Sequence, residues 1–225
     1  RWYRHLRRLE NGSPQDIGVT VTWATWGPPP SSLAAVTQRE GLHVHQQTLT
    51  GLGTRDPYSE HFDGWVQDDL NLETFGLNWT KGESVWKSDG AASGLFERSS
   101  TNTEYILSAG DLKTATKHQR VFNGLPKATL PMSLRMLTGK LLIQAELSGE
   151  QIRWYAPILS SEDVALTARR DRVKPHKEGT RVTWTPRQGE PATVDQFDAG
   201  GVLQKRTFPD GSEMVLTDYA SLVQA

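Results

Sequence analysis

The 225-residue sequence contains no cysteine. This absence excludes disulfide bonds, thiol catalysis and zinc sites built from cysteine, but it leaves the cellular compartment open. No apolar run approaches the roughly 20 residues that a membrane-spanning helix needs, so we expect no transmembrane segment. Formal net charge is -1, and binding to duplex nucleic acid requires a basic face. We therefore expect no nucleic-acid partner.

Three catalytic and nucleotide-binding motifs are also missing. The sequence has no G-x-S-x-G, which would place a nucleophilic serine on a strand-turn-helix. It has neither G-x-G-x-x-G nor G-x-x-x-x-G-K-[ST], the glycine-rich patterns that hold phosphates. We therefore expect no cofactor.

The composition is that of an ordinary folded domain. Hydrophobic residues make up 36% of the chain and charged residues 23%. This length supports a substantial core, and no linker or repeat divides the chain, so residues 1–225 are interpreted as a single domain. The chain starts with Arg1 rather than Met, so we expect a trimmed N-terminus, which leaves a lost signal peptide or lipid anchor open.

Alternating side chains predict a mainly β protein. Ile17, Val19, Val21 and Trp23 alternate with smaller or polar residues, as in a strand with one buried face. In the C-terminal third, strands are predicted near residues 180–185, 191–197, 202–208 and 213–219. Short turns separate these strands, which is typical of an antiparallel meander.

Helices are predicted at four places. Residues 1–12 read as an N-terminal helix, because Trp2, Leu6 and Leu9 share one helical face and Asn11-Gly12 ends the segment. Further helices are expected near residues 31–40, 111–121 and 131–138. The predicted fold class is mainly β (α+β), an antiparallel sheet with helices packed against one face.

Histidines and carboxylates gather in the first third of the chain. His43 and His45 are two residues apart on one predicted strand face, and an acidic stretch covers residues 56–73. This spacing fits either a metal site or an exposed strand face beside an acidic loop. We expect no metal, and take Glu60, His43 and His45 as candidate general acids or bases.

The sequence contains eight tryptophans, and aromatic side chains crowd the first 90 residues. Such side chains either line an apolar cavity or form the core between layers, and the sequence leaves both open. The candidate ligand-binding residues are Trp23, Trp26, Tyr58, Ser59, Phe62 and Trp65.

The segment Val182–Leu222 resembles the closing strands of the LolA/LolB-like superfamily. The matching pattern is a D-x-x-G-x-L turn, here Asp198 to Leu203, followed by strands that end near an acidic-aromatic pair, here Asp218-Tyr219. The resemblance implies a curved antiparallel sheet, an open half-barrel with helices packed on the concave face. It also implies an apolar cavity that binds acyl chains or another hydrophobic ligand.

A second resemblance is to the violacein-biosynthesis enzyme, which has the fold of that superfamily. Thr25-Trp26-Gly27-Pro28 and Pro57-Tyr58-Ser59-Glu60 are similar to two stretches that border its pocket, although the intervening residues differ and this chain is longer. The resemblance implies that Tyr58, Ser59 and Glu60 lie at a pocket edge.

These observations favour a carrier that holds a hydrophobic small molecule or lipid, such as the acyl chains of a lipoprotein. The expected location is the periplasm or the outer membrane, with the cytoplasm as an open alternative. One alternative function is a metal- and nucleotide-independent enzyme that acts on an apolar aromatic substrate. Another is an assembly or interaction subunit with a protein partner in the cell envelope.

Overall fold

The structure is a computed structural model, and most of the chain can be described from it. The described residues are 1–31, 40–51, 54, 56–66, 72–81, 84–92, 104–111, 116–123, 154–159, 164–169, 171–185 and 189–223.

Strands dominate the described chain. The strands before residue 124 are β1 (Trp2–Arg8), β2 (Pro14–Gly27), β3 (Gly41–Thr50), β4 (Tyr58–Val66), β5 (Leu72–Lys81), β6 (Ser84–Ala92), β7 (Glu104–Asp111) and β8 (Thr116–Asn123). The later strands are β9 (Trp154–Leu159), β10 (Val164–Arg169), β11 (Arg172–His176), β12 (Gly179–Trp184), β13 (Thr193–Asp198), β14 (Leu203–Thr207) and β15 (Glu213–Thr217). The C-terminal meander predicted from the sequence is confirmed in β12 to β15.

Thirteen of these strands form one antiparallel sheet, in the order β11-β12-β13-β14-β15-β1-β2-β3-β4-β5-β6-β7-β8. Neighbours in the sheet are neighbours in the sequence except at β15 and β1, where the two ends of the chain pair through Tyr3 and Leu216. Strands β9 and β10 form a separate hairpin that contacts β7 and β8. Within the described residues, β8 and β11 each have one neighbour, so the sheet is not closed into a barrel.

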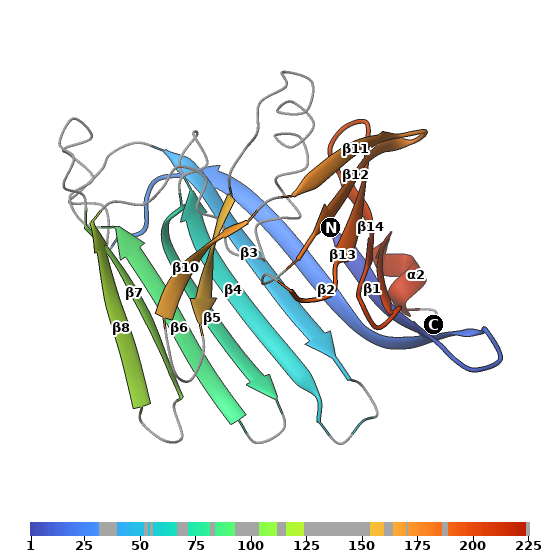
Figure 1. The fold of residues 1–225 in the computed structure, drawn as a ribbon, viewed down its shortest axis with the longest axis horizontal. Helices are drawn as coiled ribbons and strands as arrows, with labels where there is room; N and C mark the ends of the chain where they lie inside the picture. The colour runs from blue at the N-terminus through green and yellow to red at the C-terminus, as the bar shows by residue number, and fades with distance from the viewer. Residues whose placement is uncertain are drawn as a thin grey trace.

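The sheet is strongly bent rather than flat. In Figure 1, β12 to β15 are turned at an angle to the broad array of β3 to β8, and β1 and β2 connect the two parts. The register between β1 and β2 shifts between His5 and Leu6, and such a bulge increases local bending and twist. Beside this shift, a Cβ added to Gly18 would lie 2.2 Å from the Leu49 carbonyl oxygen. Glycine therefore permits the close approach of β2 and β3 at the bend.

The core follows the alternation of the strands. Tyr3, Val44, Phe62 and Leu203 are fully buried, and they come from strands in both parts of the sheet. The ring of Phe62 stacks on that of Phe75 on the neighbouring strand, with centroids 6.1 Å apart. Each such side chain contributes about 1.5–3 kcal/mol when it leaves water, so this burial stabilises the strand register that positions the cavity described below.

The predicted N-terminal helix is wrong, because residues 2–8 form strand β1. The helical interpretation rests on the spacing of Trp2, Leu6 and Leu9. In the structure the buried residues of β1 are Tyr3 and His5, which alternate as in a strand. A buried histidine conceals this alternation in the sequence, and pairing with both β15 and β2 decides the conformation.

The predicted helix near residues 111–121 is also wrong. Residues 104–111 and 116–123 are the paired strands β7 and β8. On β8, Gln119, Arg120 and Val121 are exposed, and an edge strand with exposed polar side chains lacks a clear hydrophobic period.

The other two predicted helices, near 31–40 and 131–138, lie wholly or mostly outside the described residues. Within the described part of the chain the helix is α2 (Tyr219–Val223), a single short turn near the C-terminus. Helices on the concave face therefore stay a prediction. The described residues contain no helix with the length and apolar character that a bilayer crossing needs.

Candidate functional site

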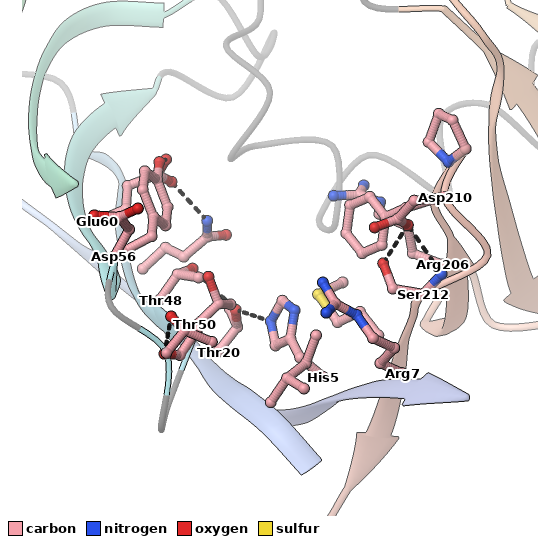
Figure 2. Close-up of a pocket in the computed structure, with 18 residues that line it drawn as sticks. His5, Arg7, Thr20, Thr48, Thr50, Asp56, Glu60, Arg206, Asp210 and Ser212 are labelled. Carbon is pink, nitrogen blue, oxygen red and sulfur yellow. Dashed lines mark hydrogen bonds between the residues drawn. The ribbon is translucent and has the colours of Figure 1, made fainter. Parts of the chain in front are cut away.

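A cavity with a volume of about 790 Å³ lies where the sheet bends. Figure 2 shows its two walls facing each other across the base that carries His5. One wall comes from β3 and β4 and displays Thr48, Thr50 and Glu60. The opposite wall comes from β14 and the turn that follows it, and displays Arg206. Segments distant in the sequence thus meet around one space.

Strand alternation places the polar residues of the first wall. Gln46, Thr48 and Thr50 occupy alternate positions of β3, so they share one face. Antiparallel pairing sets Thr48 opposite Glu60 and Thr50 opposite Tyr58 on β4. These five side chains all line the cavity, and the wall they form is rich in hydrogen-bonding groups.

Glu60 is held from two sides. The Tyr58 hydroxyl donates a hydrogen bond to Oε2 of Glu60, and Nε2 of Gln46 donates to Oε1 at 3.3 Å. Burial, and then the neighbouring Glu60 charge, raise the pKa of Tyr58 well above its usual value. Tyr58 therefore remains a protonated donor and keeps the carboxylate of Glu60 in place.

A chain of side-chain hydrogen bonds crosses the base of the cavity. Nε2 of His5 lies 2.7 Å from Oγ1 of Thr20, which lies 2.9 Å from Oγ1 of Thr48. Burial, and then the positive charge of Arg206, lower the pKa of His5 to about 4. His5 is consequently a neutral imidazole at physiological pH, with one ring nitrogen that donates and one that accepts.

The second wall rests on a buried ion pair. Nε and Nη2 of Arg206 donate to the two carboxylate oxygens of Asp195, at 2.7 and 3.0 Å. The indole Nε1 of Trp184 donates to the same carboxylate at 3.0 Å, and its ring lies 5.3 Å from the guanidinium carbon of Arg206. Asp195 is fully buried. This arrangement fixes the charge of Arg206 against Asp195 at the edge of the cavity.

The remaining lining combines apolar and polar groups. Ile17, Phe208 and Met214 supply apolar surface, and the Phe208 ring stacks near His5 with centroids 6.3 Å apart. In the turn after β14, the amide and hydroxyl of Ser212 donate to Asp210 at 2.9 and 2.6 Å. These bonds lower the pKa of Asp210. The cavity can therefore hold a molecule with both an apolar and a polar portion.

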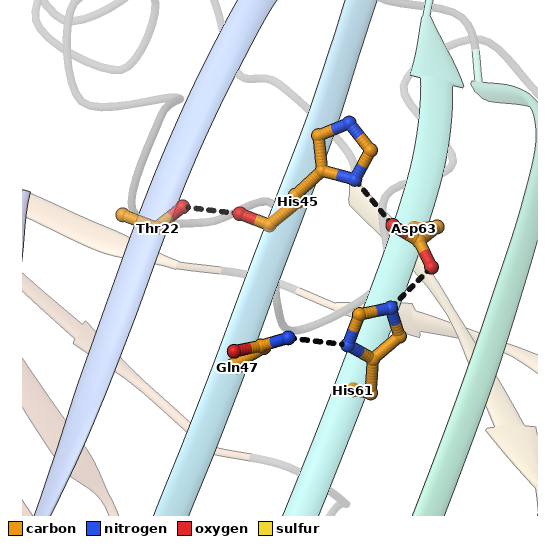
Figure 3. Close-up of polar contacts among 5 residues, drawn as sticks. All are labelled: Thr22, His45, Gln47, His61 and Asp63. Carbon is orange, nitrogen blue, oxygen red and sulfur yellow. Dashed lines mark hydrogen bonds and ion pairs between the residues drawn. The ribbon is translucent and has the colours of Figure 1, made fainter.

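The opposite face of the sheet carries a second polar cluster, shown in Figure 3. His45 and His61 each form a hydrogen bond with one oxygen of Asp63, and Nε2 of Gln47 lies 3.1 Å from Nδ1 of His61. The Trp23 ring stacks on His45, with centroids 5.1 Å apart. Nowhere in the described residues do three or more metal-ligating side chains gather in a way that could hold an ion.

The structure separates the three candidate acids and bases. Glu60 lines the cavity, whereas His43 and His45 lie on the opposite face of β3. His43 directs its Nε2 to the carbonyl oxygen of Pro28 at 2.5 Å. The catalytic roles expected of these residues stay predictions, but the structure does not bring the three together.

The six predicted ligand-binding residues also lie in different parts of the structure. Tyr58 lines the cavity, whereas Trp23 and Ser59 lie on the opposite face, where Ser59 contacts Thr80 at 2.8 Å. Phe62 and Trp65 are buried in the core. The remaining residue of the set is Trp26, which is 56% exposed and donates from Nε1 to Glu40 at 2.9 Å. Their binding roles stay predictions.

Sequence reasoning missed most of the polar residues that line the cavity, among them His5, Gln46, Thr48 and Arg206. Their shared signal is a polar side chain at an inward position of a strand. Such positions are easily read as breaks in a hydrophobic pattern, although a buried polar group requires partners and often marks a site.

Comparison with models of known families finds no match, and comparison with curated proteins finds none either. Among solved structures, the chain is similar to the crystal structure of a beta-barrel-like protein of domain of unknown function DUF1849 from Brucella abortus. The two chains are 12% identical, the similarity covers 96% of each, and the TM-score is 0.47. The resemblance to the LolA/LolB-like superfamily stays a prediction.

Proposed function

We propose that this protein is a binding protein that holds an apolar small molecule in the cavity at the bend of its sheet. The observation that carries the proposal is the cavity itself, whose volume of about 790 Å³ lies within the range of small-molecule sites. Ile17, Phe208 and Met214 provide apolar contact, at about 25 cal/mol for each Å² of apolar surface removed from water.

The ligand class that we propose is a lipid or the acyl chains of a lipoprotein, carried in the periplasm or at the outer membrane. Two observations support this class: an open, bent antiparallel sheet and the sequence resemblance of the C-terminal strands. The hydroxyl groups of Thr20 and Thr48 at the base would then receive the polar end of the ligand.

Native mass spectrometry and lipid extraction of the purified protein test this proposal. We expect a co-purifying apolar molecule, displaced by a hydrophobic dye that binds the same cavity. Thr48→Trp would obstruct the cavity and weaken dye binding, whereas Leu49→Trp, on the opposite face of the same strand, would leave it unchanged. If neither ligand nor dye binds, or if both variants behave alike, the carrier function is wrong.

An enzyme on the same scaffold is the second candidate, favoured by the placement of Glu60 in the cavity. The Tyr58 hydroxyl and the Gln46 amide orient this carboxylate, as a general acid or base requires. Incubation with apolar aromatic substrates distinguishes the two functions. Catalysis by Glu60 predicts that Glu60→Gln abolishes turnover and preserves binding, whereas a carrier shows no turnover in either form.

A further inference from the structure

Within the described residues, the side chain of Gln46 has one hydrogen-bonding atom without a partner. Gln46 lines the cavity, is 5% exposed, and donates from Nε2 to the Glu60 carboxylate. Its Oε1 is buried and receives no hydrogen bond in the described part of the chain. If Oε1 and Nε2 of Gln46 exchanged places, Oε1 would face the carboxylate of Glu60, and two acceptors would then meet without a hydrogen. The Glu60 carboxylate therefore fixes the orientation of the Gln46 amide. The wall of the cavity therefore contains a buried acceptor whose hydrogen-bonding capacity is unused.

Next to this acceptor, Thr48 ends the hydrogen-bonded chain from His5 through Thr20. A neutral imidazole can present either a donor or an acceptor to Thr20, and each threonine hydroxyl then turns accordingly. The Thr48 hydroxyl can consequently donate to a ligand or accept from it. Gln46 and Thr48 lie two residues apart on one strand, about 7 Å between their Cα atoms, a span suited to a small group with two hydroxyls.

The charges around the cavity do not select an ionic ligand of one sign. Asp56, Glu60 and Asp210 line it together with Arg7 and Arg206, so a carboxylate or an ammonium ion would each meet like charge as well as opposite charge. The charge of Arg206 is already paired with Asp195. A neutral polar group avoids the repulsion from like charge and the cost of removing an ion from water.

Building on the proposed function, we propose that the polar end of the ligand is a neutral, hydroxyl-bearing group of the kind found in glycerol esters. One ligand hydroxyl donates to Oε1 of Gln46, and a second exchanges hydrogen bonds with the hydroxyl of Thr48. The apolar chain lies against the apolar lining of the cavity.

Four probes that share a ten-carbon chain test the head group: monodecanoylglycerol, methyl decanoate, decanoic acid and decylamine. Each is used below its critical micelle concentration. Dissociation constants come from isothermal titration calorimetry with the intact protein. We expect the glycerol ester to bind about 25- to 100-fold more tightly than the methyl ester, which has the same chain but no hydroxyl and so lacks both hydrogen bonds. The acid and the amine bind more weakly than the glycerol ester.

Matched variants assign the effect to the two residues. Gln46→Leu and Thr48→Val each weaken the glycerol ester about 5- to 10-fold, the effect of one lost hydrogen bond, and leave the methyl ester unchanged. Gln47→Leu, the same substitution one residue along on the opposite face, changes neither. Thr48→Val preserves side-chain shape, so its effect remains interpretable if Gln46→Leu unfolds the protein.

The outcomes separate the inference from the proposed function. Three results would each overturn the hydroxyl head group and leave the carrier function standing. These are equal binding of the glycerol and methyl esters, tighter binding of the acid or the amine than of the glycerol ester, and unchanged binding of the glycerol ester by the Thr48→Val variant. If none of the four probes binds, the carrier function fails and the inference fails with it.

Discussion

Substitution of Asp195 by alanine should destabilise the protein more than any single surface change. Asp195 is fully buried and accepts hydrogen bonds from Arg206 and from Trp184. Alanine at this position would leave the guanidinium of Arg206, itself 7% exposed, without its partner and the indole N–H of Trp184 with one bond fewer. An uncompensated buried charge is among the costliest defects in a folded protein.

The expected loss in the free energy of unfolding is about 3–5 kcal/mol, the range for breaking a buried ion pair by removing one partner. For a chain of this size, each kcal/mol lowers Tm by about 2–4 °C, so the expected decrease is about 6–20 °C. The double variant Asp195→Leu with Arg206→Met removes both charges and should lose less than Asp195→Ala, because no charge stays buried alone.

Urea unfolding followed by tryptophan fluorescence, together with calorimetric Tm values, measures these differences. Lys205→Ala is the matched control, since Lys205 is adjacent to Arg206 and pairs with Glu213 at 2.6 Å in a more exposed position. Exposed pairs contribute at most about 1 kcal/mol. If Asp195→Ala costs no more than Lys205→Ala, or less than the double variant, the buried pair does not have the role assigned to it.

Three further predictions follow from the burial of single residues. The pKa of His5 is about 4 in the folded protein and 6.5 for the unperturbed side chain, so between these pH values the unfolded state binds the proton and the folded state does not. The free energy of unfolding should therefore fall by about 3 kcal/mol as pH decreases from 6.5 to 4. His5→Gln should flatten this pH dependence, as measured by urea unfolding at several pH values. Gly18→Ala should lower the free energy of unfolding by about 1–3 kcal/mol, because the added Cβ would meet the Leu49 carbonyl oxygen. Gly76→Ala is the control and should change it by less than about 0.5 kcal/mol, because a Cβ at Gly76 would lie in open space. Equal losses in urea unfolding would contradict the close approach of β2 and β3 at Gly18. Phe62→Ala should cost about 3–5 kcal/mol by the same assay, and a loss under about 1 kcal/mol would show that the side chain is not core.

The acids, bases and aromatics selected from the sequence illustrate the limit of pattern reasoning about a site. Glu60 and Tyr58, both predicted from the sequence, line the cavity. His45, selected for its spacing from His43, lies on the opposite face and bonds Asp63 instead. Spacing along a strand shows which residues share a face, but it does not show which face turns toward a cavity.

The N-terminal segment illustrates the limit for the fold. Trp2, Leu6 and Leu9 have helical spacing, and nothing local to residues 1–12 contradicts it. Strand β1 exists because β15 and β2 offer hydrogen-bonding edges on its two sides, and those edges belong to opposite ends of the chain. For so short a segment, intrinsic helix propensity contributes less to stability than pairing with two neighbouring strands.

The sequence by itself determined the antiparallel β character of this protein, because side chains that alternate between water and core leave a local period of two, as at Ile17 to Trp23. The absence of cysteine and of phosphate-binding motifs is likewise evident from the sequence. Only the tertiary structure decided that the ends of the chain pair, that the sheet bends at β1 and β2, and that Gln46, His5 and Arg206 face one cavity. These features depend on contacts between distant segments, which a local pattern does not record.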